Sequence, residues 1–106
     1  MRRLIVTADD FGVAREVNNA VEWAHREGVL TAASLMVGAP EAADAVARAR
    51  RWPSLCLGLH LVLAEGGPIL PLSRVPDLVD RSGAFRTDIA RAGAPIFFHI
   101  PPMNPL

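Results

Sequence analysis

Apolar positions in the first half of the chain alternate between short strand-like runs and helical spacings. The first run, Leu4 to Thr7, leads into Asp9-Asp10-Phe11-Gly12. A short apolar run ended by a glycine is typical of a buried strand that leads into a helix. We therefore expect a first strand that carries two carboxylates at its carboxyl end. The alternative is that one aspartate caps the next helix and the other is solvated.

The next segment has the spacing of an amphipathic helix, with apolar residues at i, i+3, i+4 and i+7. That stripe is Val17, Ala20, Val21 and Ala24. Gly28 suits the position just after a helix. The pattern places four polar residues off the apolar stripe: Asn18, Asn19, Glu22 and Arg26. His25 lies one position past the stripe and is predicted to be a half-exposed surface residue.

A second strand and helix follow in the same order. Thr31 to Val37 is an apolar run ended by Gly38, and Pro40 suits the first turn of a helix. The apolar stripe of this helix is Ala42, Ala45, Val46 and Ala49. Trp52-Pro53 ends it. We interpret the arginines near its end as a solvated face that complements the helix dipole: Arg48, Arg50 and Arg51.

The third strand alternates with a period of two between Leu55 and Leu63. Leucines share one parity, whereas Gly58 and His60 share the other. In a barrel the leucine face is expected to meet the helices, which leaves His60 facing the lumen. The sequence thus predicts parallel strands joined by helices.

The second half has weaker patterns. Residues 64–71 read as a loop, Val75 to Asp80 as a short helical turn and Ser82-Gly83 as a turn. Thr87 could cap a helix over Asp88 to Ala92. Residues 95–106 are rich in proline and are predicted to be an extended tail, in which His99 receives no functional role. We therefore divide the chain into 1–94 and 95–106.

Composition narrows the function classes. All eleven basic residues are arginine and balance eleven acidic residues, so net charge gives no reason to expect nucleic acid or a membrane surface as partner. The lack of lysine excludes lysine nucleophiles and Schiff bases from this chain. Cys56 is the only cysteine, so neither an internal disulfide nor a thiolate cluster can form. No segment has the roughly 18 apolar residues of a membrane span, and a soluble cytoplasmic protein is the expectation.

Two carboxylates after the first strand and a histidine on the third are expected to meet at one edge of a parallel sheet. An aspartate oxygen and a histidine nitrogen are suitable ligands for a divalent metal, and a neighbouring carboxylate can act as general base. A phospho-acceptor receiver domain is disfavoured because it needs an aspartate after the third strand and a later lysine. A dinucleotide-binding fold is disfavoured because no Gly-x-Gly-x-x-Gly follows the first strand.

The motifs Thr7-Ala-Asp-Asp-Phe-Gly12, Val17-Asn18, Gly28-Val-Leu-Thr-Ala-Ala-Ser-Leu-Met-Val37 and Gly58-Leu-His-Leu61 together resemble those of the YdjC-like carbohydrate deacetylases. This group includes the chitooligosaccharide deacetylases. The stretch from Arg81 to Phe98 resembles the hopanoid-biosynthesis-associated subfamily.

The resemblance implies the amino-terminal part of a distorted, TIM-like (β/α) barrel with about three β/α units. It implies a metal-dependent N-deacetylase of sugars, with Mg²⁺ or Zn²⁺ held by Asp10 and His60 and with Asp9 as general base. The implied substrate is an N-acetylated sugar or glycolipid, such as an N-acetylglucosaminyl hopanoid. The oligomeric state stays open, with a homodimer as the candidate for the full-length family.

The chain departs from the family pattern in one respect. Family members are longer and supply a third metal ligand from a later histidine-rich motif, which this sequence lacks. A closed barrel takes on the order of 250 residues. We therefore expect a truncated or frameshifted reading frame, and a catalytically silent fragment that acts at most as a binding module is the second hypothesis.

Overall fold

The computed structural model describes residues 2–88, 93 and 97. The chain divides into two compact units, Met1–Leu61 and Val62–Leu106. In the described part of the chain, no helix combines the length and the apolar character that crossing a bilayer requires.

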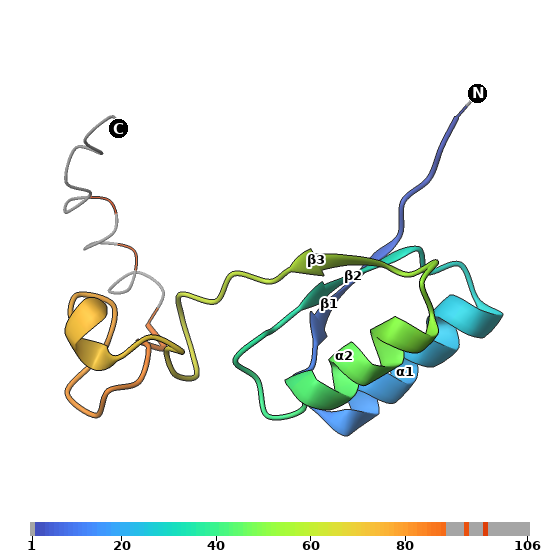
Figure 1. Cartoon of the computed structure of the whole chain (residues 1–106). Helices are drawn as coiled ribbons and strands as arrows, with labels where there is room; N and C mark the ends of the chain where they lie inside the picture. The colour runs from blue at the N-terminus through green and yellow to red at the C-terminus, as the bar shows by residue number, and fades with distance from the viewer. Residues whose placement is uncertain (1, 89–92, 94–96, 98–106) are drawn as a thin grey trace, which may run out of the picture. The chain divides into compact units, whose positions relative to one another are not determined.

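The first unit is a three-stranded parallel sheet in the order β1-β2-β3. Its elements follow the chain as β1 (Thr7–Phe11), α1 (Arg15–Glu27), β2 (Ala32–Leu35), α2 (Ala42–Arg51) and β3 (Cys56–Leu59). Both helices lie on the same face of the sheet (Figure 1). The predicted α/β alternation and the parallel pairing are confirmed.

The first strand begins later than its apolar run predicts. Leu4 and Ile5 precede β1 and are each 77% exposed, so the prediction of a buried strand over these residues is wrong. Pairing starts only at Val6, whose carbonyl oxygen accepts from the N–H groups of Thr31 and Ala32. The strand therefore extends through both aspartates to Phe11.

The core of this unit lies between the sheet and the two helices. Phe11 is completely buried, and burial of such a side chain stabilises the fold by roughly 1.5–3 kcal/mol. Its buried apolar neighbours come from α1, β2 and α2 and from the segments just before β2 and β3: Val21, Leu30, Ala33, Leu35, Ala45 and Leu55. The core thus fixes the end of β1, where the two aspartates lie.

The buried face of α1 differs from the predicted stripe. Val21 is buried as predicted, but Ala20 is exposed and Asn18 is completely buried. The predicted end of the helix is confirmed, because the N–H of Gly28 donates to Ala24 O at 3.1 Å and a side chain at Gly28 would clash with that oxygen. Val17 and Ala24 also pack against the core, so the predicted stripe is confirmed except that Asn18, and not Ala20, is buried.

The predicted solvated arginine face of α2 is wrong for Arg48. Its side chain is only 14% exposed and donates to Glu22 Oε2 of α1 and to Asp44 Oδ2, both at 2.7 Å. Trp52 Nε1 also donates to Glu22, at 2.8 Å. This cluster, which we call the Glu22 network, joins α1 to α2.

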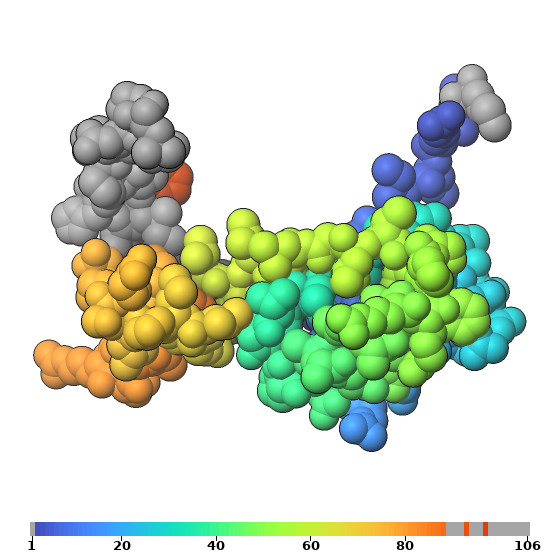
Figure 2. All heavy atoms as spheres, in the orientation of Figure 1, coloured from blue at the N-terminus to red at the C-terminus, as the bar shows by residue number. Residues whose placement is uncertain are grey.

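The leucine face of β3 does not meet the helices as predicted. Leu55 is buried, whereas Leu57 and Leu59 are 43% and 60% exposed. Leu57 pairs with the buried Ala33, and Leu59 with the buried Leu35, so these leucines continue the core face beyond the two helices. In the space-filling view the atoms of β3 lie uncovered along the upper edge (Figure 2).

Among its described residues, the second unit has the short helix η1 (Leu72–Arg74), two helical residues at Gly93 and Phe97, and no regular strand. The segment Val75 to Asp80, predicted as a helical turn, forms no helix but contains a single hydrogen-bonded turn, in which Leu78 N–H donates to Val75 O at 3.2 Å. Val79 and Phe85 form an isolated antiparallel bridge around the turn predicted at Ser82-Gly83, and Phe85 is buried. The predicted helix beyond Asp88 and nearly all of residues 95–106, including His99, lie outside the described residues.

Candidate functional site

Asp9 and Asp10 lie in a β-bulge at the end of β1. Ala8 pairs with Ala33 and Phe11 pairs with Leu35, so the two aspartates lie opposite the single residue Ser34. In a regular strand, neighbouring side chains point to opposite faces, and one carboxylate would face the helices. The extra residue returns Phe11 to the core and leaves both carboxylates exposed.

The bulge depends on an unusual backbone conformation at Asp10. Its φ is +59°, a left-handed value that aspartate and asparagine adopt more readily than other side chains. The carbonyl oxygen of Asp10 accepts from Val13 N–H at 3.0 Å, which closes the turn into α1. The second aspartate is therefore suited to this position by its backbone as well as by its charge.

His60 lies directly after β3, and its backbone N–H donates to Leu35 O at 2.9 Å. Its Nδ1 lies 3.5 Å from Asp10 Oδ1 and 3.3 Å from Ser34 Oγ. The hydroxyl of Ser34 donates to Asp9 Oδ1 at 2.8 Å. The structure thus brings Asp9, Asp10 and His60 together from two strands, through a serine on the strand between them.

The spacing of Asp10 and His60 fits two ligands of one divalent metal. Ligand atoms about 2.1 Å from a metal at a tetrahedral angle are themselves about 3.4 Å apart, close to the 3.5 Å between Asp10 Oδ1 and His60 Nδ1. His60 Nδ1 also accepts a long hydrogen bond, 3.4 Å, from Asp10 N–H. It accepts only when unprotonated, which is the form that binds metals.

The described residues supply these two ligands but not a complete set. No group of three or more histidine, cysteine, aspartate or glutamate side chains among them could hold a metal ion. An open two-ligand arrangement leaves the remaining positions to residues or water from elsewhere.

Asn18 anchors the turn that follows the bulge. Its Oδ1 accepts from Gly12 N–H at 2.8 Å, and its Nδ2 donates to Glu41 O at 3.1 Å and to Asp44 Oδ2 at 2.9 Å. Gly12 has a φ of +105°, and a side chain there would approach Ala42 Cα within 3.2 Å. The buried amide and the glycine together hold the start of α2 against the end of β1.

Ser34 and Asn18 lie within the motifs that carry the family resemblance, but the sequence analysis gave neither residue a role in the site. Ser34 is a polar residue in the middle of an otherwise apolar segment. Its strand lies between the strand that carries the two aspartates and the strand that precedes His60, and this position could have identified it from the sequence. Asn18 gives no comparable signal, because helical spacing places it off the apolar stripe.

His25 lies outside the site and has structural partners. It is half-buried, as predicted, but Nδ1 contacts Leu30 O and Nε2 contacts Ser54 Oγ, each at 2.8 Å. These contacts tie the end of α1 to the segments before β2 and β3.

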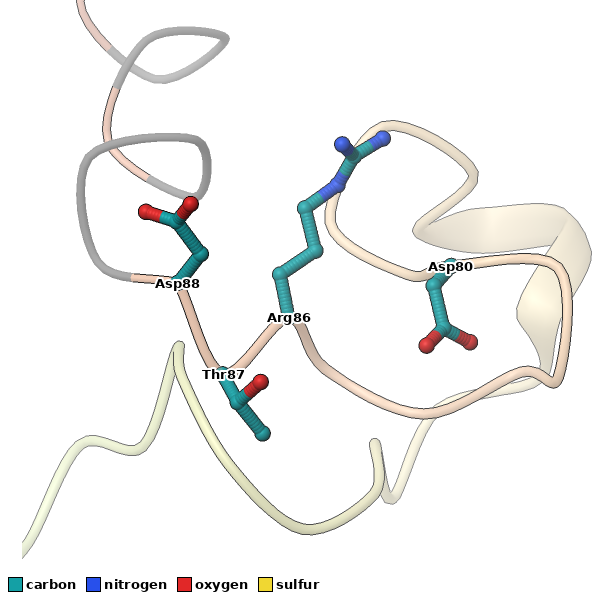
Figure 3. Close-up of a pocket in the computed structure, with 4 residues that line it drawn as sticks. All are labelled: Asp80, Arg86, Thr87 and Asp88. Atoms are coloured by element: carbon teal, nitrogen blue, oxygen red, sulfur yellow. The ribbon is translucent and has the colours of Figure 1, made fainter.

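A separate pocket of about 190 Å³ lies in the second unit, lined by Asp80, Arg86, Thr87 and Asp88 (Figure 3). Asp80 is committed to its own turn, since Oδ1 accepts from the hydroxyl of Ser82 at 2.6 Å, and from the N–H groups of Ser82 and Ala84. The Ser82 hydroxyl is the main reason that the pKa of Asp80 is lowered. We assign this pocket no part in the site.

Comparisons with known proteins agree on one family. The family model described as YdjC-like protein matches residues 3–99. A carbohydrate deacetylase of Brevibacillus brevis is 48% identical over 84 residues, which cover 79% of this chain and 33% of the relative. A carbohydrate deacetylase of Vibrio vulnificus strain CMCP6 is 42% identical over 83 residues, which cover 78% of this chain and 32% of the relative.

A solved structure shares the fold. The crystal structure of a protein from Enterococcus faecalis V583, provisionally described as a cellobiose-phosphate cleavage protein, superposes with a TM-score of 0.77 at 36% identity. The match covers 84% of this chain and 35% of that protein. The chain thus spans about a third of the length of the relatives it matches.

Proposed function

Because the chain belongs to the YdjC-like protein family, we propose that it carries part of the active site of a metal-dependent carbohydrate deacetylase. The observation that carries the proposal is the meeting of Asp10 Oδ1 and His60 Nδ1 at 3.5 Å, with a second carboxylate beside them. The deacetylase relatives support the reaction class. The rest of a (β/α) barrel would surround this site in the complete enzyme.

Each site residue has a distinct proposed role. Asp10 and His60 would hold a divalent ion, Mg²⁺ or Zn²⁺, which when bound acidifies water and polarises the acetamide carbonyl. Asp9, which is next to Asp10 in the bulge, would accept the proton of the attacking water as general base. The same carboxylic acid can then return the proton to the leaving amine, which balances hydrolysis to acetate and a free amino sugar.

Three finer proposals are kept apart from the reaction class. The N-acetylglucosaminyl hopanoid as substrate rests on the resemblance of residues 81–98, and the division into a barrel segment, 1–94, and an atypical tail, 95–106, rests on the proline-rich composition of the tail. A cytoplasmic location is the third proposal. Equal acetate release from chitooligosaccharides and from the hopanoid glycolipid would remove the subfamily proposal while leaving the deacetylase intact.

The reaction is best tested with two proteins, the 106-residue chain and a hybrid. In the hybrid, the matched segment of this chain replaces the 84 matched residues of the Brevibacillus brevis deacetylase. We expect the hybrid to release acetate from N-acetylated chitooligosaccharides, to lose this activity with a chelator and to regain it with a divalent metal. A soluble, folded hybrid without acetate release under any metal would contradict the proposal.

A second candidate is that the 106-residue chain is catalytically silent by itself. It is favoured by the two-ligand set within the described residues and by the third of the relatives' length that the chain spans. Calorimetric titration with Zn²⁺ and Mg²⁺ distinguishes a silent chain from a chain that binds metal by itself. We expect weak or no binding. Tight stoichiometric binding would count against the silent chain.

A further inference from the structure

Ser34 lies at the centre of the cluster and has no role in the proposal above. It occupies the middle of β2, opposite both residues of the bulge, and is half-buried on the sheet face away from the helices. Its neighbours along the strand, Ala33 and Leu35, are buried in the core. The hydroxyl therefore contributes to the site, and not to the core, by its position in the strand.

The hydroxyl has one proton and two neighbours. The distance from Ser34 Oγ to Asp9 Oδ1 is 2.8 Å, whereas the distance to His60 Nδ1 is 3.3 Å. Hydroxyl-to-oxygen hydrogen bonds have their optimum near 2.7–2.8 Å, so the proton is committed to Asp9. Because the bond uses Oδ1, the other carboxylate oxygen of Asp9, Oδ2, stays available to accept a proton.

We propose that Ser34 is a positioning residue, which aims the general base Asp9 by holding Oδ1 and presenting Oδ2 to the attacking water. This role rests on the proposed deacetylase function. Asp9 is exposed on an irregular strand end, and without this bond its side chain would rotate freely. Fixed orientation of a catalytic group contributes to the rate without altering substrate binding.

The catalytic test compares three variants in whichever of the chain and the hybrid releases acetate. Ser34→Ala is expected to lower kcat by about 10–100-fold, the usual effect of removing an outer partner of a catalytic group, and to leave KM within about twofold. Ser34→Thr keeps the hydroxyl and suits a strand, so kcat should recover to within about threefold of the wild type. Ser54→Ala is the matched control: it removes the exposed hydroxyl that contacts His25 Nε2, and it should not change kcat.

A second readout needs neither metal nor activity. In the full 106-residue chain at pH 7, the side-chain ¹³C resonance of Asp9 should shift in Ser34→Ala and return in Ser34→Thr. The resonance of Asp44, which is bonded to Asn18 and Arg48, should stay in place as the internal control.

The outcomes separate the two proposals. An active wild type with an equally active Ser34→Ala variant, or an unmoved Asp9 resonance, overturns the positioning role alone. Loss of activity in Ser34→Thr equal to that in Ser34→Ala also overturns it, because a hydroxyl would then not be what matters. No acetate release from either wild-type protein overturns the deacetylase function, and the Asp9 resonance then reports only a structural hydrogen bond.

Discussion

At the scale of single residues, the bulge explains how two adjacent carboxylates share one face. The sequence motif places Asp9 and Asp10 at the end of a strand, but strand periodicity alone would send them to opposite faces. The left-handed backbone at Asp10, with a φ of +59°, resolves this conflict. The residue types of the site were predictable from the motif, whereas the bulge was not, because one extra residue leaves no mark on an apolar pattern.

The backbone role of Asp10 can be separated from its charge. Asp10→Asn keeps a side chain that tolerates the left-handed conformation, so the free energy of unfolding should change by only a few tenths of a kcal/mol. Asp10→Ala should lower it by about 1 kcal/mol more, because alanine lacks the side chain that eases this conformation. Urea denaturation of both variants measures the difference. Equal stability of the two would show that the left-handed backbone at Asp10 costs nothing.

Asn18 is the buried polar residue on which the turn depends. Asn18→Ala should lower the free energy of unfolding by about 1–3 kcal/mol, because it leaves the buried Gly12 N–H without its partner, whereas Glu41 O keeps the hydrogen bond from Ala45 N–H. The exposed neighbour provides the control: Asn19→Ala should stay within about 0.5 kcal/mol of the wild type. Denaturant titrations of both variants measure this, and similar losses at the two positions would refute the anchoring role.

At the scale of elements, the Glu22 network joins the helices that carry the site's supports. Glu22 Oε2 accepts from Arg48 Nη1 at 2.7 Å, and Asp44 accepts from both Arg48 and Asn18. The contacts therefore run from the turn after β1, through α2, to the middle of α1. Sequence periodicity predicted both helices correctly, but it could not show that Arg48 turns inward, since an arginine near a helix end is usually solvated.

The network makes stability depend on pH. The hydrogen bond from Trp52 and the charges of Arg51 and Arg48 lower the pKa of Glu22 below its ordinary value of 4.5. A carboxyl group whose pKa is lower in the folded chain than in the unfolded chain stabilises the fold at pH values above its unfolded-state pKa. This contribution is lost as the pH falls through the folded-state pKa. The thermal midpoint should therefore fall as the pH drops from about 4.5 downward.

Two substitutions assign this loss to the network. Glu22→Gln should lower the free energy of unfolding at pH 7 by about 1–2 kcal/mol and flatten the acid part of the stability profile. Glu27→Gln removes only an exposed partner of Arg26, at 3.6 Å, and should leave the profile unchanged. If Glu22→Gln keeps the full acid dependence, other carboxylates cause it.

At the scale of the whole molecule, the first unit was largely predictable and the second was not. Strands and helices of the first unit follow from apolar periodicity and from glycine and proline positions. Leu4 and Ile5 are the exception, because no strand in the described part of the chain pairs with them. In the second unit, single turns such as Leu72–Arg74 depend on local contacts that leave no periodic pattern. The exposure of Leu57 and Leu59 in β3 also could not be predicted, because an alternating pattern identifies an apolar face but does not show whether another element covers it.

The central claim is that Asp9, Asp10 and His60 form the metal-dependent half of a deacetylase site. Its most direct test is the rate of acetate release by the hybrid, with Asp9→Asn and the exposed Asp77→Asn as a matched control. We predict that Asp9→Asn, which keeps the shape and removes the base, lowers kcat at least 100-fold, whereas Asp77→Asn keeps the wild-type rate. Turnover by Asp9→Asn within threefold of the wild type would contradict the account.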